Sequence, residues 1–269
     1  MSADSKELDV RLDLARKIAR EAGQLTLRFF RGDQYVVERK DDDSPVTIAD
    51  RQAEELLRKR IEATFPADAI VGEECGNREG TSEFRWILDP IDGTTSFISG
   101  VPLYGTLVGV EYRQRSIIGV IHIPVLDELI YAGQDRGAWY SRAGGAPVAA
   151  HVSRSERLAD GLFVTSQIDL FEQRDAGQVF RELQRRAYIT RTWGDCYGYL
   201  LVATGRADLM VDPVMRVWDA APMQPIPEES GGVFTDWLGE STVYHGEGIA
   251  TTRQLLPEVL EITRSFAQP

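Results

Sequence analysis

Cysteine and positive charge are both scarce in this sequence, and each shortage excludes a class of protein. The 269 residues include two cysteines, Cys75 and Cys196, which are too few for a disulfide framework. Neither has a Cys or His neighbour at the spacing of a zinc site. Lys and Arg total 30 against 42 Asp and Glu, a formal net charge of −12, so the chain repels phosphate polymers. We expect a cytoplasmic protein with no nucleic-acid partner.

Long hydrophobic runs are missing as well. No segment has the roughly 20 consecutive apolar residues of a membrane span. The N-terminus carries Asp4, Lys6 and Glu7 where a signal peptide would have its apolar core. With 43% hydrophobic and 27% charged residues, the composition is that of an ordinary globular protein with a large core. We therefore expect a soluble protein without a membrane partner.

The first half of the chain has the pattern of helices followed by strands. Apolar residues recur at helical spacing over 5–30 and 48–65. Trp139 and Tyr140 are expected to close the sheet. Helices before a run of consecutive strands predict an α+β half over residues 1–145. The expected strands are 69–74, 84–88, 105–112, 117–123 and 128–132.

The second half alternates between strand and helix patterns, which predicts an α/β half over residues 146–269. No Ser-rich or Pro-rich linker separates the halves, so we expect one compact unit with its site between them. Pro227 should shorten or kink the helix in which it lies. The expected strands are 162–166, 188–193, 207–211 and 248–251. The expected helices are 176–186, 194–203 and 255–266, with 219–230 helical in part.

The most informative segment of the chain runs from Trp86 to Thr95. Its apolar start predicts the end of a buried strand, after which Asp89 and Asp92 stand three positions apart. Gly93 permits a tight turn, and the threonines after it can cap a short helix. Carboxylates bind hard divalent cations and helix N-termini bind anions, so the segment predicts metal and phosphate binding. The alternative for such a motif on its own is a solvated turn.

Other acidic residues stand at the ends of predicted elements. Each of them alone is interpreted as a solvated charge or a helix cap. Strand ends that turn into helices are also where α/β proteins build their sites, so together they predict a cluster. These residues are Asp50, Glu73, Glu74, Asp212 and Asp219.

Three groups of residues resemble the inositol monophosphatase family of magnesium-dependent, lithium-sensitive phosphatases. The resemblance implies a layered αβαβα sandwich of two packed subdomains, which assembles as a homodimer. It also implies two or three Mg²⁺ ions per site, with Mn²⁺ as a substitute and Li⁺ as an inhibitor. A phosphatase with a nucleophilic Asp is excluded, because Pro90 occupies the position of that Asp. The matching groups are Gly72-Glu73-Glu74, Trp86 through Thr95, and Trp218-Asp219-Ala220-Ala221 followed by Glu229-Ser230-Gly231-Gly232.

The resemblance further implies a role for each site residue. Thr94 and Asp50 would orient the attacking water, and Glu74 would lie in the surroundings of the metal. Crowded carboxylates agree with this, because cations neutralise them and acidify a bound water. The implied metal ligands are Glu73, Asp89, the carbonyl of Ile91, Asp92 and Asp219. The implied phosphate ligands are the N–H groups of Gly93, Thr94 and Thr95.

Residues 191–199 indicate which substrate of the family this protein favours. This segment resembles the histidinol-phosphate phosphatase branch of the family, as does the pair Asp212-Pro213. Asp195 and its aromatic neighbours would suit the ammonium and imidazole groups of L-histidinol phosphate. Arg191, Asp195 and Asp212 are therefore the candidate substrate residues. In the alternative interpretation, Asp195 only caps a helix and the aromatic residues only fill the core.

The sequence thus predicts Mg²⁺-dependent hydrolysis of a small phosphate monoester, with L-histidinol phosphate of histidine biosynthesis as the favoured substrate. Within the family, the alternatives are an inositol or other polyol or sugar phosphatase and, less favoured, a nucleotide 3′-phosphatase. From another class, the alternative is a metal-binding protein without catalysis. A large distance between Asp50 or Thr94 and the metal ligands would favour that last interpretation.

Overall fold

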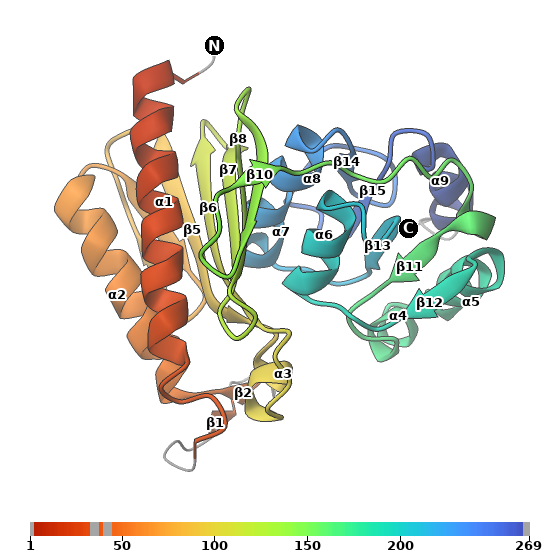
Figure 1. The fold of residues 1–269 in the computed structure, drawn as a ribbon, viewed down its shortest axis with the longest axis horizontal. Coiled ribbons are helices and arrows are strands. Elements are labelled where there is room, and N and C mark those ends of the chain that lie inside the picture. Colours follow the sequence, from red (N-terminus) through yellow and green to blue (C-terminus); the bar gives the residue numbers. More distant parts are fainter. Residues whose placement is uncertain (1–2, 33–37, 40–44, 266–269) are drawn as a thin grey trace.

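The computed structural model describes residues 3–32, 38–39 and 45–265, which form five layers (Figure 1). Helices α1 (Ser5–Thr26) and α2 (Ile48–Thr64) cover one face of an eight-stranded sheet. Three helices separate this sheet from a five-stranded one: α6 (Cys196–Ala203), α7 (Val217–Met223) and α8 (Pro225–Glu229). The outer helices beyond the small sheet are α4 (Asp169–Gln173), α5 (Gly177–Arg186) and α9 (Leu256–Arg264). The expected αβαβα sandwich is confirmed.

The large sheet is antiparallel except for the pair β3 and β5, and its order is β10-β9-β8-β7-β6-β5-β3-β4. Helices cover both faces, so its central strands are buried along nearly all of their length and their sequences are mainly apolar. Its strands are β3 (Ala69–Gly72), β4 (Asn77–Arg78), β5 (Phe84–Asp92), β6 (Gly105–Tyr112), β7 (Arg115–Ile123), β8 (Glu128–Gly133), β9 (Gly137–Arg142) and β10 (Val148–Ala149).

The small sheet has the order β12-β11-β13-β15-β14 and mixes parallel with antiparallel pairs. Strand β11 runs parallel to β12 and β13, whereas β15 runs antiparallel to both of its neighbours. The carboxyl ends of β11 and β13 therefore meet at one edge, which is where α/β proteins place ligands. Its strands are β11 (Leu162–Val164), β12 (Ile189–Arg191), β13 (Leu209–Asp212), β14 (Val233–Thr235) and β15 (Gly248–Thr251).

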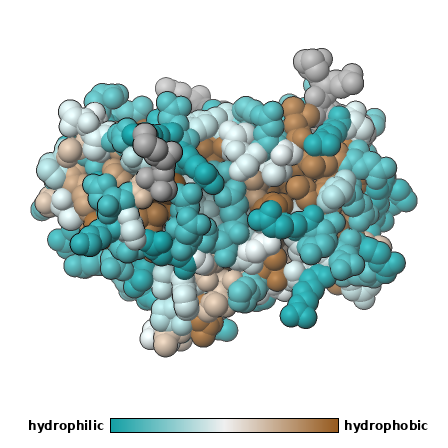
Figure 2. Space-filling model, turned by 90° about the horizontal axis from the view of Figure 1, so that it is seen from above, coloured by the Kyte–Doolittle hydropathy of each residue, from teal (hydrophilic) through white to brown (hydrophobic). Residues whose placement is uncertain are grey.

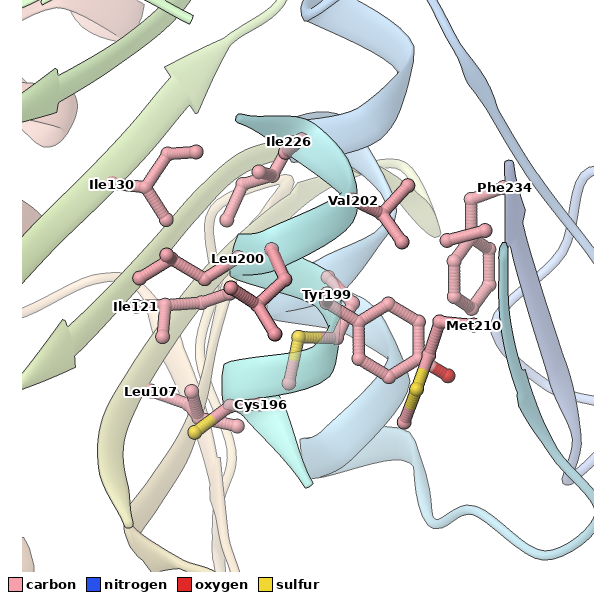
Figure 3. Close-up of a cluster of buried hydrophobic side chains, with 14 of the residues drawn as sticks. Leu107, Ile121, Ile130, Cys196, Tyr199, Leu200, Val202, Met210, Ile226 and Phe234 are labelled. Atoms are coloured by element: carbon pink, nitrogen blue, oxygen red, sulfur yellow. The ribbon is translucent and has the colours of Figure 1, made fainter. Parts of the chain in front are cut away.

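Helix α6 joins the two sheets through its side chains (Figure 3). Leu200 points towards Ile121 and Ile130 of the large sheet, whereas Tyr199 points towards Met210 of the small sheet. A helix that is apolar on all sides must be buried on all sides, and every residue of α6 except Tyr197 is buried. It therefore fixes the position of one sheet relative to the other.

Helix α7 reaches the large sheet through a pair of glycines. Gly109 of β6 and Gly119 of β7 are partners across the sheet. A Cβ added at Gly119 would lie 2.0 Å from the carbonyl oxygen of Pro222, and one at Gly109 would lie 3.1 Å from the Pro222 nitrogen. The Ser116 hydroxyl donates to the carbonyl of Ala221 at 2.5 Å. Only a surface without side chains lets the helix come this close.

Several predicted boundaries change in the structure. Strand β5 continues to Asp92, so both acids of the central motif lie in the strand itself. The sheet ends at β10 and not at Trp139 and Tyr140. The break in the helical segment 217–229 falls at Gln224, before Pro225, because a Pro is accommodated at a helix start. Pro227 lies inside the short helix α8, so the break comes before it.

Other parts of the fold were not predicted. Strand β14 and the 3-10 turn Leu158–Asp160 had no clear pattern, nor did the ribbon of β1 (Glu38–Arg39) and β2 (Pro45–Val46). Among the described helices, none has the length and apolar character needed to span a membrane. The division at residue 145 stays a prediction, although β10, just after it, still pairs with β9.

Candidate functional site

Three aspartates from two layers form a compact acidic cluster. Asp89 and Asp92 lie at the end of β5, and Asp219 lies in the first turn of α7. Each offers a carboxylate oxygen, and these oxygens lie within 4.8 Å of one another. Asp219 arrives there because α7 rests on Gly109 and Gly119. The structure therefore brings together residues that the sequence separates by more than a hundred positions.

The cluster is electrostatically costly without a counter-charge. Burial raises the pKa of Asp89 well above its usual range, with the charges of Glu73 and Asp92 adding to the effect. Burial and the charge of Asp195 do the same for the pKa of Asp92. Burial raises the pKa of Asp219 to about 7. A bound cation would reverse these effects, because it stabilises the ionised carboxylates.

Glu73 enters the cluster from the end of β3. Its backbone N–H donates to the carbonyl of Leu88 at 3.2 Å, which continues the parallel pairing of β3 and β5. The buried carboxylate of Glu54 accepts the N–H groups of Glu74 and Cys75 at 2.7 and 3.1 Å. Glu54 therefore fixes the turn that carries Glu73 and Glu74. Glu54 was not predicted as a site residue, because in the sequence it is one acid among several on a helix.

Asp50 is buried at the start of α2. It accepts hydrogen bonds from the Thr47 N–H and hydroxyl at 2.8 and 2.6 Å, which makes a capping box. Burial raises the pKa of Asp50 to about 6, and the nearby charge of Glu73 contributes to the rise. Asp50 therefore lies close enough to Glu73 to interact with it. Its hydrogen bonds run to Thr47, a residue that had not been singled out.

The turn after the strand is built around Gly93. Its φ of 82° is in the left-handed region, and it occupies the N-cap position of α3 (Thr94–Ile98), where a threonine had been expected. The Thr94 hydroxyl donates to the carbonyl of Ile91 at 3.1 Å. The first N–H groups of a helix have no partner within it, so those of Thr94 and Thr95 stay candidates for an anion.

Asp195 faces this turn from the second half of the chain. Its backbone is strained, with φ 46° and ψ −150°, and its side chain does not cap α6. A Cβ added at Gly93 would lie 2.8 Å from the Asp195 Oδ2 atom. The cap of α6 comes from elsewhere, because the Cys196 N–H donates to Asp92 at 2.5 Å. The interpretation of Asp195 as an ordinary capping residue is therefore wrong.

Asp212 ends strand β13 beside Asp195. Its carboxylate accepts the Tyr199 hydroxyl at 3.1 Å and the Ser166 N–H at 3.2 Å. Burial raises the pKa of Asp212 to about 7. The Ser166 hydroxyl also accepts the N–H of Asp195 at 2.9 Å, so one serine holds both acids. Ser166 was not predicted as a site residue, although it is the last residue of a predicted strand.

The aromatic residues and Arg191 are placed differently from the acids. The described contacts of Arg191 run to the carbonyl of Thr190 and, at 6.0 Å, to the ring of Trp193. The Tyr197 hydroxyl lies 3.5 Å from Glu128 and its ring 5.9 Å from Arg206, in a separate cluster. Trp193 is 44% exposed. These contacts do not connect Arg191 or Tyr197 to the acidic cluster.

A second group of ligating side chains is present in the described residues. Asp236, Glu240 and His245 also bring such atoms within 4.8 Å of one another. The Asp236 carboxylate accepts the N–H groups of Leu238 and Glu240 at 2.9 and 2.7 Å, and His245 Nδ1 lies 2.7 Å away. These bonds close a surface loop, which accounts for the group without a metal.

The cluster around Asp89 fits a hard divalent cation better. Its donors are all oxygens, they come from strand and helix ends, and their mutual repulsion is poorly screened because they are at least half-buried. Mg²⁺ prefers such a set and keeps open positions for water and phosphate. The residues present therefore fit a metal centre that also binds a phosphate.

Comparison with known proteins agrees with this chemistry. Residues 7–267 match the model of the inositol monophosphatase family. The chain is 41% identical to a histidinol-phosphatase of Chlorobaculum parvum, over 91% of this chain and 93% of that protein. It is 34% identical to a histidinol-phosphatase of Streptomyces coelicolor, over 93% and 95%. An inositol monophosphatase structure from Zymomonas mobilis superposes with a TM-score of 0.82 at 32% identity, covering 97% of this chain and all of that one (100%).

Proposed function

The chain belongs to the inositol monophosphatase family of metal-dependent phosphatases, and from this premise we propose that it hydrolyses L-histidinol phosphate to L-histidinol and phosphate. The observation that carries the choice of substrate is the position of Asp195. Its carboxylate adjoins Gly93 of the metal-binding turn and is not used to cap α6. A carboxylate at that place suits an ammonium group of the substrate. The two histidinol-phosphatases named above support the same choice.

We assign the metal ligands to Glu73, Asp89, the Ile91 carbonyl, Asp92 and Asp219, with two or three Mg²⁺ ions per site. Mn²⁺ would substitute for Mg²⁺, and Li⁺ would inhibit. Bound Mg²⁺ supplies an acidified water and neutralises the charge that develops on the leaving oxygen. Among this chain's own residues, the N–H groups of Gly93, Thr94 and Thr95 would hold the phosphate oxygens.

Thr94 and Asp50 have roles in orienting the attacking water. Because the Thr94 hydroxyl donates its proton to the Ile91 carbonyl, its lone pairs stay available to a water molecule. Asp50, with a pKa of about 6, can accept a proton near neutral pH. Asp195 and Asp212 would bind the ammonium end of the substrate, and Ser166 would hold both of them. Arg191 stays a weaker candidate for a substrate residue, because its described side-chain contacts run to Thr190 and Trp193.

Phosphate release from a panel of monoesters tests the proposal. L-Histidinol phosphate and myo-inositol 1-phosphate are compared at equal concentration, with and without Mg²⁺ and with added Li⁺. We expect the highest kcat/KM for L-histidinol phosphate and no turnover without a divalent cation. A clear preference for inositol phosphate would support the second candidate, an inositol monophosphatase, which the Zymomonas mobilis neighbour favours. Metal binding without any turnover would support a non-catalytic role.

We also propose that the protein acts as a cytoplasmic homodimer. Strand β12 is an edge of the small sheet, and the residues around it expose large hydrophobic side chains. Tyr188 is 72% exposed and Trp193 is 44% exposed, more than a monomer in water favours. The face in Figure 2 is by contrast mainly hydrophilic, with hydrophobic side chains in separate patches. Light scattering at several concentrations would measure the mass.

A further inference from the structure

Arg174 lies outside the acidic cluster but binds the chain next to Asp212, at the Asp212–Pro213 corner where strand β13 ends. It occupies the C-cap of α4, and its guanidinium donates to the carbonyl of Pro213 at 2.6 Å. It also forms an ion pair with Glu247, and its guanidinium carbon lies 4.5 Å above the ring of Trp237. The side chain is therefore held on three sides, and one of its contacts is the backbone next to Asp212.

The anchor of Arg174 is rigid. Phe171, in the same short helix, is fully buried, with its ring 5.8 Å from Trp237 and 5.4 Å from Phe180. The carboxylate of Glu247 in turn accepts the backbone N–H of Trp237 at 2.8 Å. A guanidinium fixed in this way loses little freedom when it binds a carbonyl, so it can fix that carbonyl in return.

The chain from Ser166 to Arg174 holds the Asp212–Pro213 corner from both sides. The Ser166 N–H binds the Asp212 carboxylate, and Arg174 binds the next carbonyl in the chain. Beyond the corner, the Met215 N–H donates to the carbonyl of Gly246 at 2.7 Å. Pro213 is buried, and a buried carbonyl requires a donor. Among the described residues, Arg174 supplies that donor.

We propose that Arg174 is a positioning residue for substrate selectivity: it sets the direction of Asp212 towards the substrate without touching the substrate itself. This inference rests on the proposed function, because it needs Asp212 to face the ammonium end of L-histidinol phosphate. Loss of Arg174 frees the Pro213 carbonyl to turn towards water, and the Asp212 carboxylate moves with it. The metal ligands lie on other elements and keep their places.

The test compares Arg174→Met, which keeps the apolar contact with Trp237, with Arg174→Lys, which keeps the charge. We expect KM for L-histidinol phosphate to rise about tenfold in R174M, with a smaller change in kcat. This is the effect of losing one charge-assisted hydrogen bond between Asp212 and the substrate. Turnover of phenyl phosphate, which has no ammonium group, should change less than twofold. R174K should recover part of the loss. Arg181→Met, at an exposed arginine of α5, is the matched control and should behave as the wild type.

The outcomes separate the two proposals. Equal losses on both substrates in R174M and R174K would assign Arg174 a general structural role and overturn the inference. An unchanged KM in R174M would overturn it as well. Wild-type protein that hydrolyses phenyl phosphate but not L-histidinol phosphate would instead overturn the proposed function. Melting temperatures of all variants show whether they are folded, and R174K carries the test if R174M does not fold.

Discussion

The backbone N–H of Cys196 donates a hydrogen bond of 2.5 Å to the Oδ2 atom of Asp92, 104 positions earlier in the chain. Asp92 thereby caps helix α6, the helix that joins the two sheets. The same carboxylate belongs to the acidic cluster, so one side chain connects the metal centre to the segment that carries Asp195. A change at the metal turn should therefore alter substrate binding, and a change in the segment that carries Asp195 should alter metal binding.

Asp92→Asn is the most direct test of the cluster. The amide keeps an oxygen for the Cys196 N–H but removes a charge, so the fold should persist while metal affinity falls. Because even the outer partners of metal ligands contribute 10–100-fold, we expect activity to drop by at least about a hundredfold. Phosphate release against Mg²⁺ concentration measures this loss, and circular dichroism checks the fold. Asp13→Asn, on an exposed face of α1, is the matched control. Near wild-type turnover in D92N would reject the assignment.

Asp195→Asn tests the substrate side. Asn has nearly the size and shape of Asp, so we expect it to fit the strained backbone that Asp195 already adopts, and only the charge is lost. We expect kcat/KM for L-histidinol phosphate to fall by about ten- to a hundredfold, the range of a charged hydrogen bond. Turnover of inositol phosphate should change little, since a polyol has no ammonium group. A parallel loss on both substrates would mean that Asp195 serves the metal turn and not the substrate.

The sequence allowed some of this site to be predicted and not the rest, for physical reasons. Asp89, Asp92 and Gly93 lie in one continuous segment, so their proximity follows from local geometry. Asp219 reaches them only because Gly109 and Gly119 admit α7 to the sheet, and no local pattern reveals which helix a pair of glycines will contact. The resemblance to a family, and not the spacing, connected Asp219 to the others.

The residues missed by the sequence analysis act through long-range hydrogen bonds. Ser166 binds Asp195 and Asp212 from a strand end, and Glu54 binds the turn after β3. Serine and glutamate are common on protein surfaces, so the residue type alone does not indicate such a role. The same holds for the order of the small sheet, where β15 reverses the parallel pattern that alternating strands and helices predict.

The glycine pair beneath α7 should be sensitive to a single methyl group. Gly119→Ala places a Cβ 2.0 Å from the Pro222 carbonyl oxygen, so the helix must shift, whereas the nearest atom to a Cβ at Gly109 is 3.1 Å away. We expect G119A to lose about 1–3 kcal/mol of unfolding free energy, the usual cost of overpacking, and G109A to lose less. Urea unfolding gives both values.

The shift of helix α7 in G119A should also change the metal centre. Because Asp219 lies on α7, G119A should require more Mg²⁺ for half-maximal activity than G109A does. Equal stability of the two variants, together with wild-type Mg²⁺ dependence, would show that α7 is not positioned by the glycine pair.

His122 should make stability depend on pH. It is buried between β7 and α1, where its Nδ1 atom lies 3.2 Å from the carbonyl oxygen of Ala19. Burial lowers the pKa of His122 from 6.5 to about 4, so the folded protein keeps the ring neutral where the unfolded chain takes up a proton. The contribution of His122 to stability is therefore constant above pH 6.5 and is lost as the pH drops towards 4. The loss amounts to about 3 kcal/mol, at 1.36 kcal/mol for each unit of pKa.

His122→Asn separates this contribution from that of the carboxylates. The Asn amide can donate to the Ala19 carbonyl in place of Nδ1, but it takes up no proton. Urea unfolding at intervals between pH 4 and 7 measures the free energy of unfolding of both proteins. The difference between wild type and H122N should shrink as the pH falls, because only the wild type has a buried ring at position 122 that resists protonation. His151→Asn, at an exposed histidine, should run parallel to the wild type. A constant difference between H122N and wild type across this range would mean that His122 keeps an ordinary pKa in the folded protein.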